Sequence, residues 1–258
     1  MAGGRRWFLL ALICSLAVAG RVAAQDVAPL PVTPPPAITD DVHPITEDVQ
    51  RLLELGELYM GMNNPDYARR PATIDPSTRD HAGPQAARVF QQVTTLAPDN
   101  ADGWLWLGIA NTEMLRYTKK APQGEPANSL ADLQAGLRAF RSAVHCQSND
   151  LLCATYYGDA LMRYGGDFDA ARDFWDNYAS TAKTDLQRVT ALTQAARACL
   201  NKAYFGKQHK TLTPDEAKSQ YASATRYVQQ AAALMPRMRA VQTMQTLLQQ
   251  YHDAFSGK

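Results

Sequence analysis

Residues 101–112 read ADGWLWLGIANT, and this stretch carries the pattern that decides the fold. Trp104, Leu107 and Gly108 lie at the spacing of one face of a helix. A second amphipathic segment, residues 132–145, follows after a loop that contains proline and glycine. Two helices joined in this way leave one apolar face uncovered, so the unit must pack against neighbours of the same kind.

Neighbouring units are present on both sides, which indicates a repeat. Gly108 and Gly158 are 50 positions apart, 16 more than one repeat of 34 residues, and the surplus falls between the two helices of a unit. The expected units span residues 49–98, 101–148, 151–182 and 185–236, followed by a capping helix at residues 237–255. The pattern is carried by Leu52, Leu55, Gly56, Tyr59, Ala86, Phe90 and Val93 in the first unit, by Gly136, Phe140 and Ala143 in the second, by Gly158, Ala170 and Phe174 in the third, and by Ala224, Val228 and Ala231 in the fourth.

A first helix with W-x₂-L-G, followed by a second helix with small and aromatic residues, resembles the tetratricopeptide repeat (TPR). The resemblance covers residues 47–255 and is most specific in the second and third units. It implies an all-α fold, a right-handed solenoid of about four helix–turn–helix units closed by a polar C-terminal helix. In the third unit we expect Phe174 to fill the core beside Gly158.

The resemblance also implies a protein-binding surface, because peptide ligands of this family lie along the first helices on the concave side. We expect Trp106 and Tyr156, which lie off the core positions of their units, to be partly exposed there. The partner-binding set carried over by repeat position is Glu57, Met60, Leu105, Trp106, Ile109, Thr112, Tyr156, Asp159 and Met162.

The N-terminus has the three regions of a signal peptide. A basic start with Arg5 and Arg6 is followed by an apolar run at residues 7–19 and by small residues ending at Ala24. We expect cleavage after Ala24, export to the periplasm by the Sec route, and a proline-rich linker at residues 25–46. The paired arginines leave the twin-arginine route open. No later stretch is long and apolar enough to span a membrane.

Charge and motif content argue against several function classes. Without the signal peptide the chain carries 23 basic and 25 acidic side chains, a net charge of −2, which argues against nucleic acid as a partner. The histidines are scattered, and no pair has the spacing of metal ligands. No nucleophile elbow, P-loop or dinucleotide fingerprint is present. We therefore expect no metal, no cofactor and no catalytic site.

Three cysteines remain after cleavage of the signal peptide. Cys146 and Cys153 flank one short turn between two units, so they form a candidate disulfide, whereas Cys199 lies near the other end of its helix. Three separate thiols are the alternative.

The sequence favours a non-catalytic scaffold or accessory subunit of a bacterial envelope assembly whose partners are other proteins. A periplasmic chaperone that holds client chains in the groove is an alternative, and an α-superhelical cell-wall enzyme is a further one. Long loops at residues 63–84, 119–131 and 206–213 are expected within the units.

Overall fold

The computed structural model describes residues 45–63, 76–117 and 130–255 of the 258-residue chain. The expected signal peptide and all but the last two residues of the proline-rich linker lie outside these residues. Most of the first two expected loops also lies outside them. Among the described helices, none is long and apolar enough to cross a membrane.

The all-α expectation is confirmed, since the described residues form helices and no strand. Short turns separate consecutive helices from α5 to α10, so that neighbours run antiparallel. The helices are α2 (Ile45–Asn63), α3 (Pro76–Leu96), α4 (Ala101–Tyr117), α5 (Leu130–Cys146), α6 (Leu151–Arg163), α7 (Phe168–Thr181), α8 (Asp185–Gln208), α9 (Pro214–Leu234) and α10 (Arg239–Phe255).

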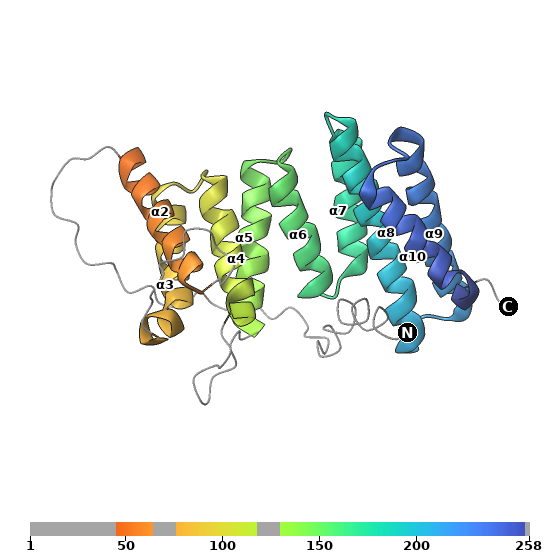
Figure 1. The fold of residues 1–258 in the computed structure, drawn as a ribbon, viewed down its shortest axis with the longest axis horizontal. Coiled ribbons are helices and arrows are strands. Elements are labelled where there is room, and N and C mark those ends of the chain that lie inside the picture. Colours follow the sequence, from red (N-terminus) through yellow and green to blue (C-terminus); the bar gives the residue numbers. More distant parts are fainter. Residues whose placement is uncertain (1–44, 64–75, 118–129, 256–258) are drawn as a thin grey trace, which may run out of the picture.

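The helices follow the chain along the long axis of the molecule, from α2 and α3 at one end to α8, α9 and α10 at the other, where α10 packs on both α8 and α9 (Figure 1). Packing is mostly between sequential neighbours, with α2 on α3, α4 on α5 and α8 on α9 in the most extensive contact. The expected third unit is looser, because α7 packs more extensively on α8 than on α6. At the far end α10 buries one apolar face, and glutamines such as Gln245 and Gln249 cover its outer side.

A glycine–aromatic contact recurs between successive helices and explains their close approach. A Cβ added to Gly108 would lie 2.5 Å from the ring of Phe140, and one added to Gly56 would lie 2.4 Å from the ring of Phe90. Both phenylalanines are almost completely buried. The missing side chain therefore lets a large ring lie against the backbone of the first helix, which any larger residue would prevent.

In the third unit the expected partner of Gly158 is wrong by one residue. A Cβ on Gly158 would lie 2.3 Å from Nε1 of Trp175, and Trp175 is fully buried. Phe174 is only half-buried and meets the ring of Tyr157 edge-on at 4.9 Å. Two adjacent aromatic residues both fit a helical period, so only the packing of α7 selects the indole. The buried positions of α7 are Ala171, Trp175 and Tyr178, at the same spacing as Ala86, Phe90 and Val93 in α3 and Ala224, Val228 and Ala231 in α9.

Two expected loops are partly helical. The helix α3 begins at Pro76, so Pro84 lies inside it and not at its start. Pro84 removes one helical hydrogen bond without ending the helix, because buried Ala82 and Ala86 anchor the turns on either side. The helix α8 runs on to Gln208, which leaves only a short connection to α9.

The start of α9 is fixed by residues that are close neighbours in the sequence. Thr213 caps the helix, and its hydroxyl accepts a hydrogen bond from the backbone N–H of Glu216 at 3.3 Å. The Glu216 carboxylate in turn accepts from the Thr213 backbone at 2.7 Å, and Pro214 occupies the first turn.

Candidate functional site

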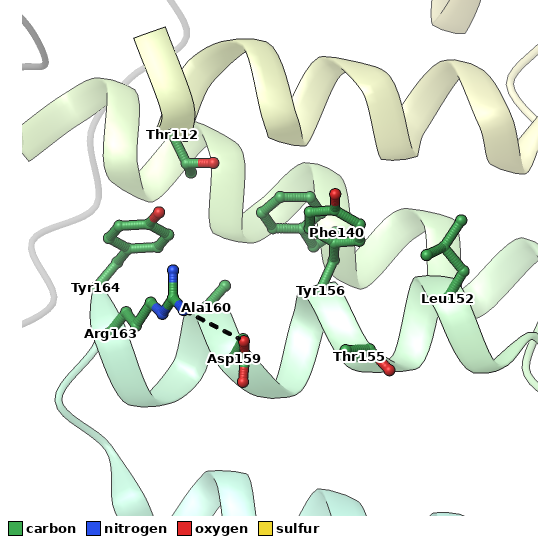
Figure 2. A pocket seen from close by; sticks show the side chains of 9 residues that line it. All are labelled: Thr112, Phe140, Leu152, Thr155, Tyr156, Asp159, Ala160, Arg163 and Tyr164. Carbon is green, nitrogen blue, oxygen red and sulfur yellow. Dashed lines mark ion pairs between the residues drawn. The ribbon is translucent and has the colours of Figure 1, made fainter. Parts of the chain in front are cut away.

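A pocket of about 340 Å³ lies where α4, α5 and α6 meet (Figure 2). One face of α6 supplies most of its walls, α5 supplies one aromatic ring and α4 one hydroxyl-bearing side chain. The pocket is lined by Thr112, Phe140, Leu152, Thr155, Tyr156, Asp159, Ala160, Arg163 and Tyr164.

The base of the pocket is a pair of stacked rings. Tyr156 lies over Phe140 with the ring centroids 5.5 Å apart and the planes 23° from parallel. The same arrangement occurs between α3 and α4, where Trp106 stacks on Phe90 at 5.9 Å and 11°. As expected, Trp106 and Tyr156 are partly exposed. Each ring therefore stacks on a phenylalanine of the preceding helix and keeps part of its surface in contact with solvent.

The threonine hydroxyls of the pocket are engaged with their own helices. Thr155 donates to the carbonyl oxygen of Leu151 at 2.7 Å, and Thr112 donates to that of Gly108 at 2.9 Å. At the rim the side chain of Leu152 is 57% exposed, the most exposed large apolar side chain of the described residues. The pocket thus offers an apolar wall, an aromatic base and a charged end.

The charged end consists of the Asp159 carboxylate and the Arg163 guanidinium, and a second guanidinium, from Arg197, binds the carboxylate from outside the pocket. Oδ1 of Asp159 accepts a hydrogen bond from Arg197 of α8 at 3.0 Å. Oδ2 of the same carboxylate lies 3.7 Å from Nη2 of Arg163, one helical turn further along α6. Arg197 lies outside the pocket and also donates to Gln194 at 3.4 Å, whereas Arg163 lies in the pocket wall. This arrangement can hold an apolar group together with a neighbouring anion.

The structure brings together only part of the predicted binding set. Thr112, Tyr156 and Asp159 meet in the pocket. Trp106 and Glu57 are partly exposed elsewhere, on α4 and α2. The remaining predicted residues are buried between helices and present no binding surface; they are Met60, Leu105, Ile109 and Met162.

Six of the nine lining residues lie outside the predicted binding set: Phe140, Leu152, Thr155, Ala160, Arg163 and Tyr164. A signal for some of them was present, because Leu152, Tyr156, Asp159 and Arg163 are spaced four, three and four residues apart on one stripe of α6. The repeat pattern predicts which residues face the partner from the average geometry of a unit. The stripe shows instead which side of α6 faces the pocket in this structure.

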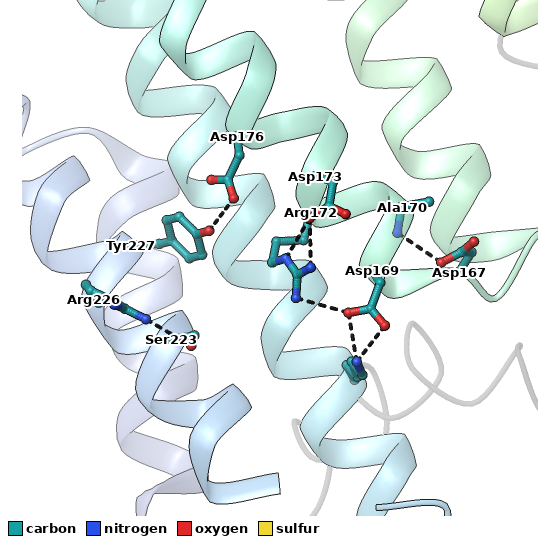
Figure 3. A network of polar contacts seen from close by, with 10 residues as sticks. Asp167, Asp169, Ala170, Arg172, Asp173, Asp176, Ser223, Arg226 and Tyr227 are labelled. Atoms are coloured by element: carbon teal, nitrogen blue, oxygen red, sulfur yellow. Dashed lines mark hydrogen bonds and ion pairs between the residues drawn. The ribbon is translucent and has the colours of Figure 1, made fainter. Parts of the chain in front are cut away.

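A second polar cluster joins α7 to α8 and α9 (Figure 3). The Asp169 carboxylate accepts from Lys202 at 2.6 Å and from Arg172 at 3.0 Å. Tyr227 of α9 donates to Asp176 at 2.6 Å, and burial together with this bond raises the pKa of the phenol. Each of these charged groups has a partner on a neighbouring turn or helix, so the cluster holds helices together and leaves no open binding position.

The candidate disulfide between Cys146 and Cys153 is not formed in this structure, where both are free thiols. The Cys146 thiol is directed to the carbonyl oxygen of Pro98 at 3.6 Å, in the turn before α4. Cys153 is buried in α6, and desolvation is the main reason that its pKa rises to about 12. Cys199 is also buried, with a pKa of about 11.

The described ranges contain no group of three or more histidine, cysteine or acidic side chains that could hold a metal ion. No protein-family model matches the chain, and no curated protein matches it significantly. The case for a function therefore rests on the geometry of the pocket between α4, α5 and α6.

Proposed function

We propose that this protein is a non-catalytic scaffold or accessory subunit of a bacterial envelope assembly, and that it binds a partner protein at the α4–α6 pocket. The pocket is the observation that carries this proposal. It combines an exposed leucine, Leu152, with an aromatic base and a charged end on one face of α6. Interfaces between proteins are enriched in such aromatic and arginine side chains.

The TPR-type solenoid is part of the same proposal. Its support is the recurring contact of a first-helix glycine with a buried second-helix ring, at Gly56, Gly108 and Gly158. Repeat arrays of this kind use the surface along successive units to bind extended partners. Export to the periplasm is supported by the basic, apolar and small-residue regions within residues 1–24.

A chaperone with a continuous apolar groove has less support. Five of the nine predicted groove residues are buried, among them Leu105, Ile109 and Met162. The predicted groove residues that stay partly exposed are Glu57, Trp106, Tyr156 and Asp159. Exposure at only some groove positions favours a defined partner over many unfolded clients.

Site-specific photocrosslinking in the native host tests the binding site. A benzophenone amino acid replaces Leu152 at the pocket rim, and a matched control variant carries it at Ala222, which is exposed on α9. We expect one main protein adduct from position 152 and none of that adduct from position 222. Mass spectrometry identifies the adduct.

A second change separates pocket binding from chance proximity. Tyr156→Ala should abolish the adduct from position 152, because it removes the aromatic base of the pocket. Far-UV circular dichroism of the variant shows whether its helices are intact. The same adducts from both positions, or an adduct that survives Tyr156→Ala in a folded protein, would contradict the proposal.

A further inference from the structure

The guanidinium of Arg163 is the charged group of the pocket with the most unused hydrogen-bonding capacity. Within the described part of the chain it forms one ion pair, with Oδ2 of Asp159 at 3.7 Å, which is too long for a hydrogen bond. Arginine carries five donors in a planar fork. Figure 2 shows this fork between the side chains of Tyr164 and Tyr156, on the side of α6 that faces the pocket.

Asp159 does not use up this capacity, because another arginine already neutralises it. Arg197 donates to Oδ1 of Asp159 at 3.0 Å from the neighbouring helix α8. The three groups Asp159, Arg163 and Arg197 therefore carry one excess positive charge. That charge lies on Arg163, whose side chain is 32% exposed. It is partly shielded from water by the rings, which strengthens its attraction for an anion.

The apolar part of the pocket lies along the same stripe of α6. Leu152 is at the far end from Arg163, and the Tyr156 ring lies between them (Figure 2). The volume of about 340 Å³ is at the lower end of the range for ligand sites. It accommodates one large side chain and its flanking backbone, and is small for a nucleotide cofactor.

We propose that the pocket binds a segment of a partner polypeptide in which an apolar side chain is adjacent to an aspartate or glutamate. The apolar side chain packs between Leu152 and Tyr156, and the carboxylate binds the fork of Arg163. This inference rests on the proposed function as a protein-binding scaffold. A basic segment is disfavoured, because Asp159 is already paired and Arg163 repels a second cation.

Capped dipeptides test the charge preference directly. The probes are acetyl-Phe-Glu-amide, acetyl-Phe-Gln-amide and acetyl-Phe-Lys-amide, together with the three dipeptides of reversed order. Binding is measured by nuclear magnetic resonance from the shifts of the Thr112 and Leu152 methyl groups. In at least one order we expect the glutamate probe to bind about 3–10-fold more tightly than the glutamine probe at low salt, and the lysine probe to bind most weakly. The preference should shrink as the salt concentration rises.

Variants assign the preference to one side chain. Arg163→Gln should make the glutamate and glutamine probes bind equally, and Arg163→Lys should retain part of the preference. Arg239→Gln removes the same charge from an exposed position at the start of α10 and should leave the preference unchanged. Far-UV circular dichroism compares the folding of all variants.

Equal binding of the glutamate and glutamine probes in both orders, or no methyl shifts with any probe, would overturn the inference. A preference that persists in Arg163→Gln would overturn it as well. These results leave the crosslink from position 152 unaffected, so the proposed function can stand when this inference fails. Conversely, an Arg163-dependent preference without any crosslinked partner supports the ligand chemistry and removes the scaffold role.

Discussion

Replacing Trp175 by alanine should cause one of the largest losses of stability in the described fold. The indole is fully buried and lies 5.1 Å from the Phe174 ring and 5.7 Å from the Tyr178 ring, centroid to centroid. An aromatic side chain buries roughly 150–250 Å², which at about 25 cal/mol per Å² corresponds to about 4–6 kcal/mol. Alanine retains a small part of that area, so we expect a loss of about 3–5 kcal/mol.

The indole nitrogen makes a second variant informative. Nε1 of Trp175 is buried without a hydrogen-bond partner within the described residues, and such a donor costs about 1–3 kcal/mol. Trp175→Phe removes this donor but leaves a smaller ring and a gap. Because the two effects oppose each other, we expect Trp175→Phe to change the free energy of unfolding by no more than about 1.5 kcal/mol.

The neighbouring residue is the matched control. Phe174 keeps part of its side chain exposed, so Phe174→Ala should cost less than Trp175→Ala, about 2–3 kcal/mol. Urea unfolding followed by far-UV circular dichroism gives the midpoint and slope for each variant. A larger loss of stability for Phe174→Ala than for Trp175→Ala would refute the reasoning, since it would indicate that Phe174 and not Trp175 fills the space beside Gly158. A wild-type midpoint for Trp175→Ala would refute it too.

Further predictions concern individual side chains. Gly108→Ala should lower the melting temperature, because a clash of about 1–3 kcal/mol with the ring 2.5 Å away outweighs the gain in helix propensity of about 1 kcal/mol. Tyr227→Phe should cost about 1–2 kcal/mol in urea unfolding, because it leaves the Asp176 carboxylate without its 2.6 Å donor. Asp169→Asn should cost less than about 1 kcal/mol, since that side chain is 48% exposed. A larger loss would mean that the ion pairs of Asp169 are shielded from solvent more than this exposure indicates. In thiol titration of the native mature protein, Cys146 should react first and the two buried thiols only after unfolding. In the folded protein the pKa of Cys153 is about 12 and that of Cys199 about 11, whereas an unfolded thiol has a pKa of about 8.5. The unfolded state therefore loses these protons first, so the free energy of unfolding should fall as the pH rises above about 9. A free energy of unfolding that stays constant over this range would contradict the prediction.

Local spacing was sufficient to predict the helices and much of how they pair. The apolar period placed Gly56 and Gly108 on the packed face of their helices, and in the structure each of them lies against a buried ring. The cap at Thr213 with Pro214 and Glu216 was readable because all of its partners lie within one helical turn. Features that depend only on neighbours in the chain can be predicted from the sequence, because their geometry is that of the helix itself.

The helix ends were less predictable. Proline and glycine near Pro84 and Gly206 indicated loops, but α3 and α8 continue through both positions. At Gly206 a Cβ would meet the side chain of Leu212 at 2.4 Å, so this glycine serves close packing and does not end the helix. Tertiary contacts can keep a segment helical through a residue that by itself disfavours a helix. A rule based on neighbouring residues does not include those contacts.

The pocket was decided by the tertiary structure. The sequence named Thr112, Tyr156 and Asp159, but it also named Leu105 and Met162, which the packing buries. The rotation of each helix about its own axis, which is set when it packs on its neighbours, decides which positions face solvent. A repeat pattern predicts only the average rotation for its family. Contacts between distant parts of the chain, such as the one between Asp159 and an arginine 38 residues later, depend on how α6, α7 and α8 are placed relative to one another. The sequence by itself therefore determined that this protein is a row of paired helices, because helical periodicity is local. The choice of Trp175 over Phe174 and the excess charge in the pocket were decided only when those helices packed together.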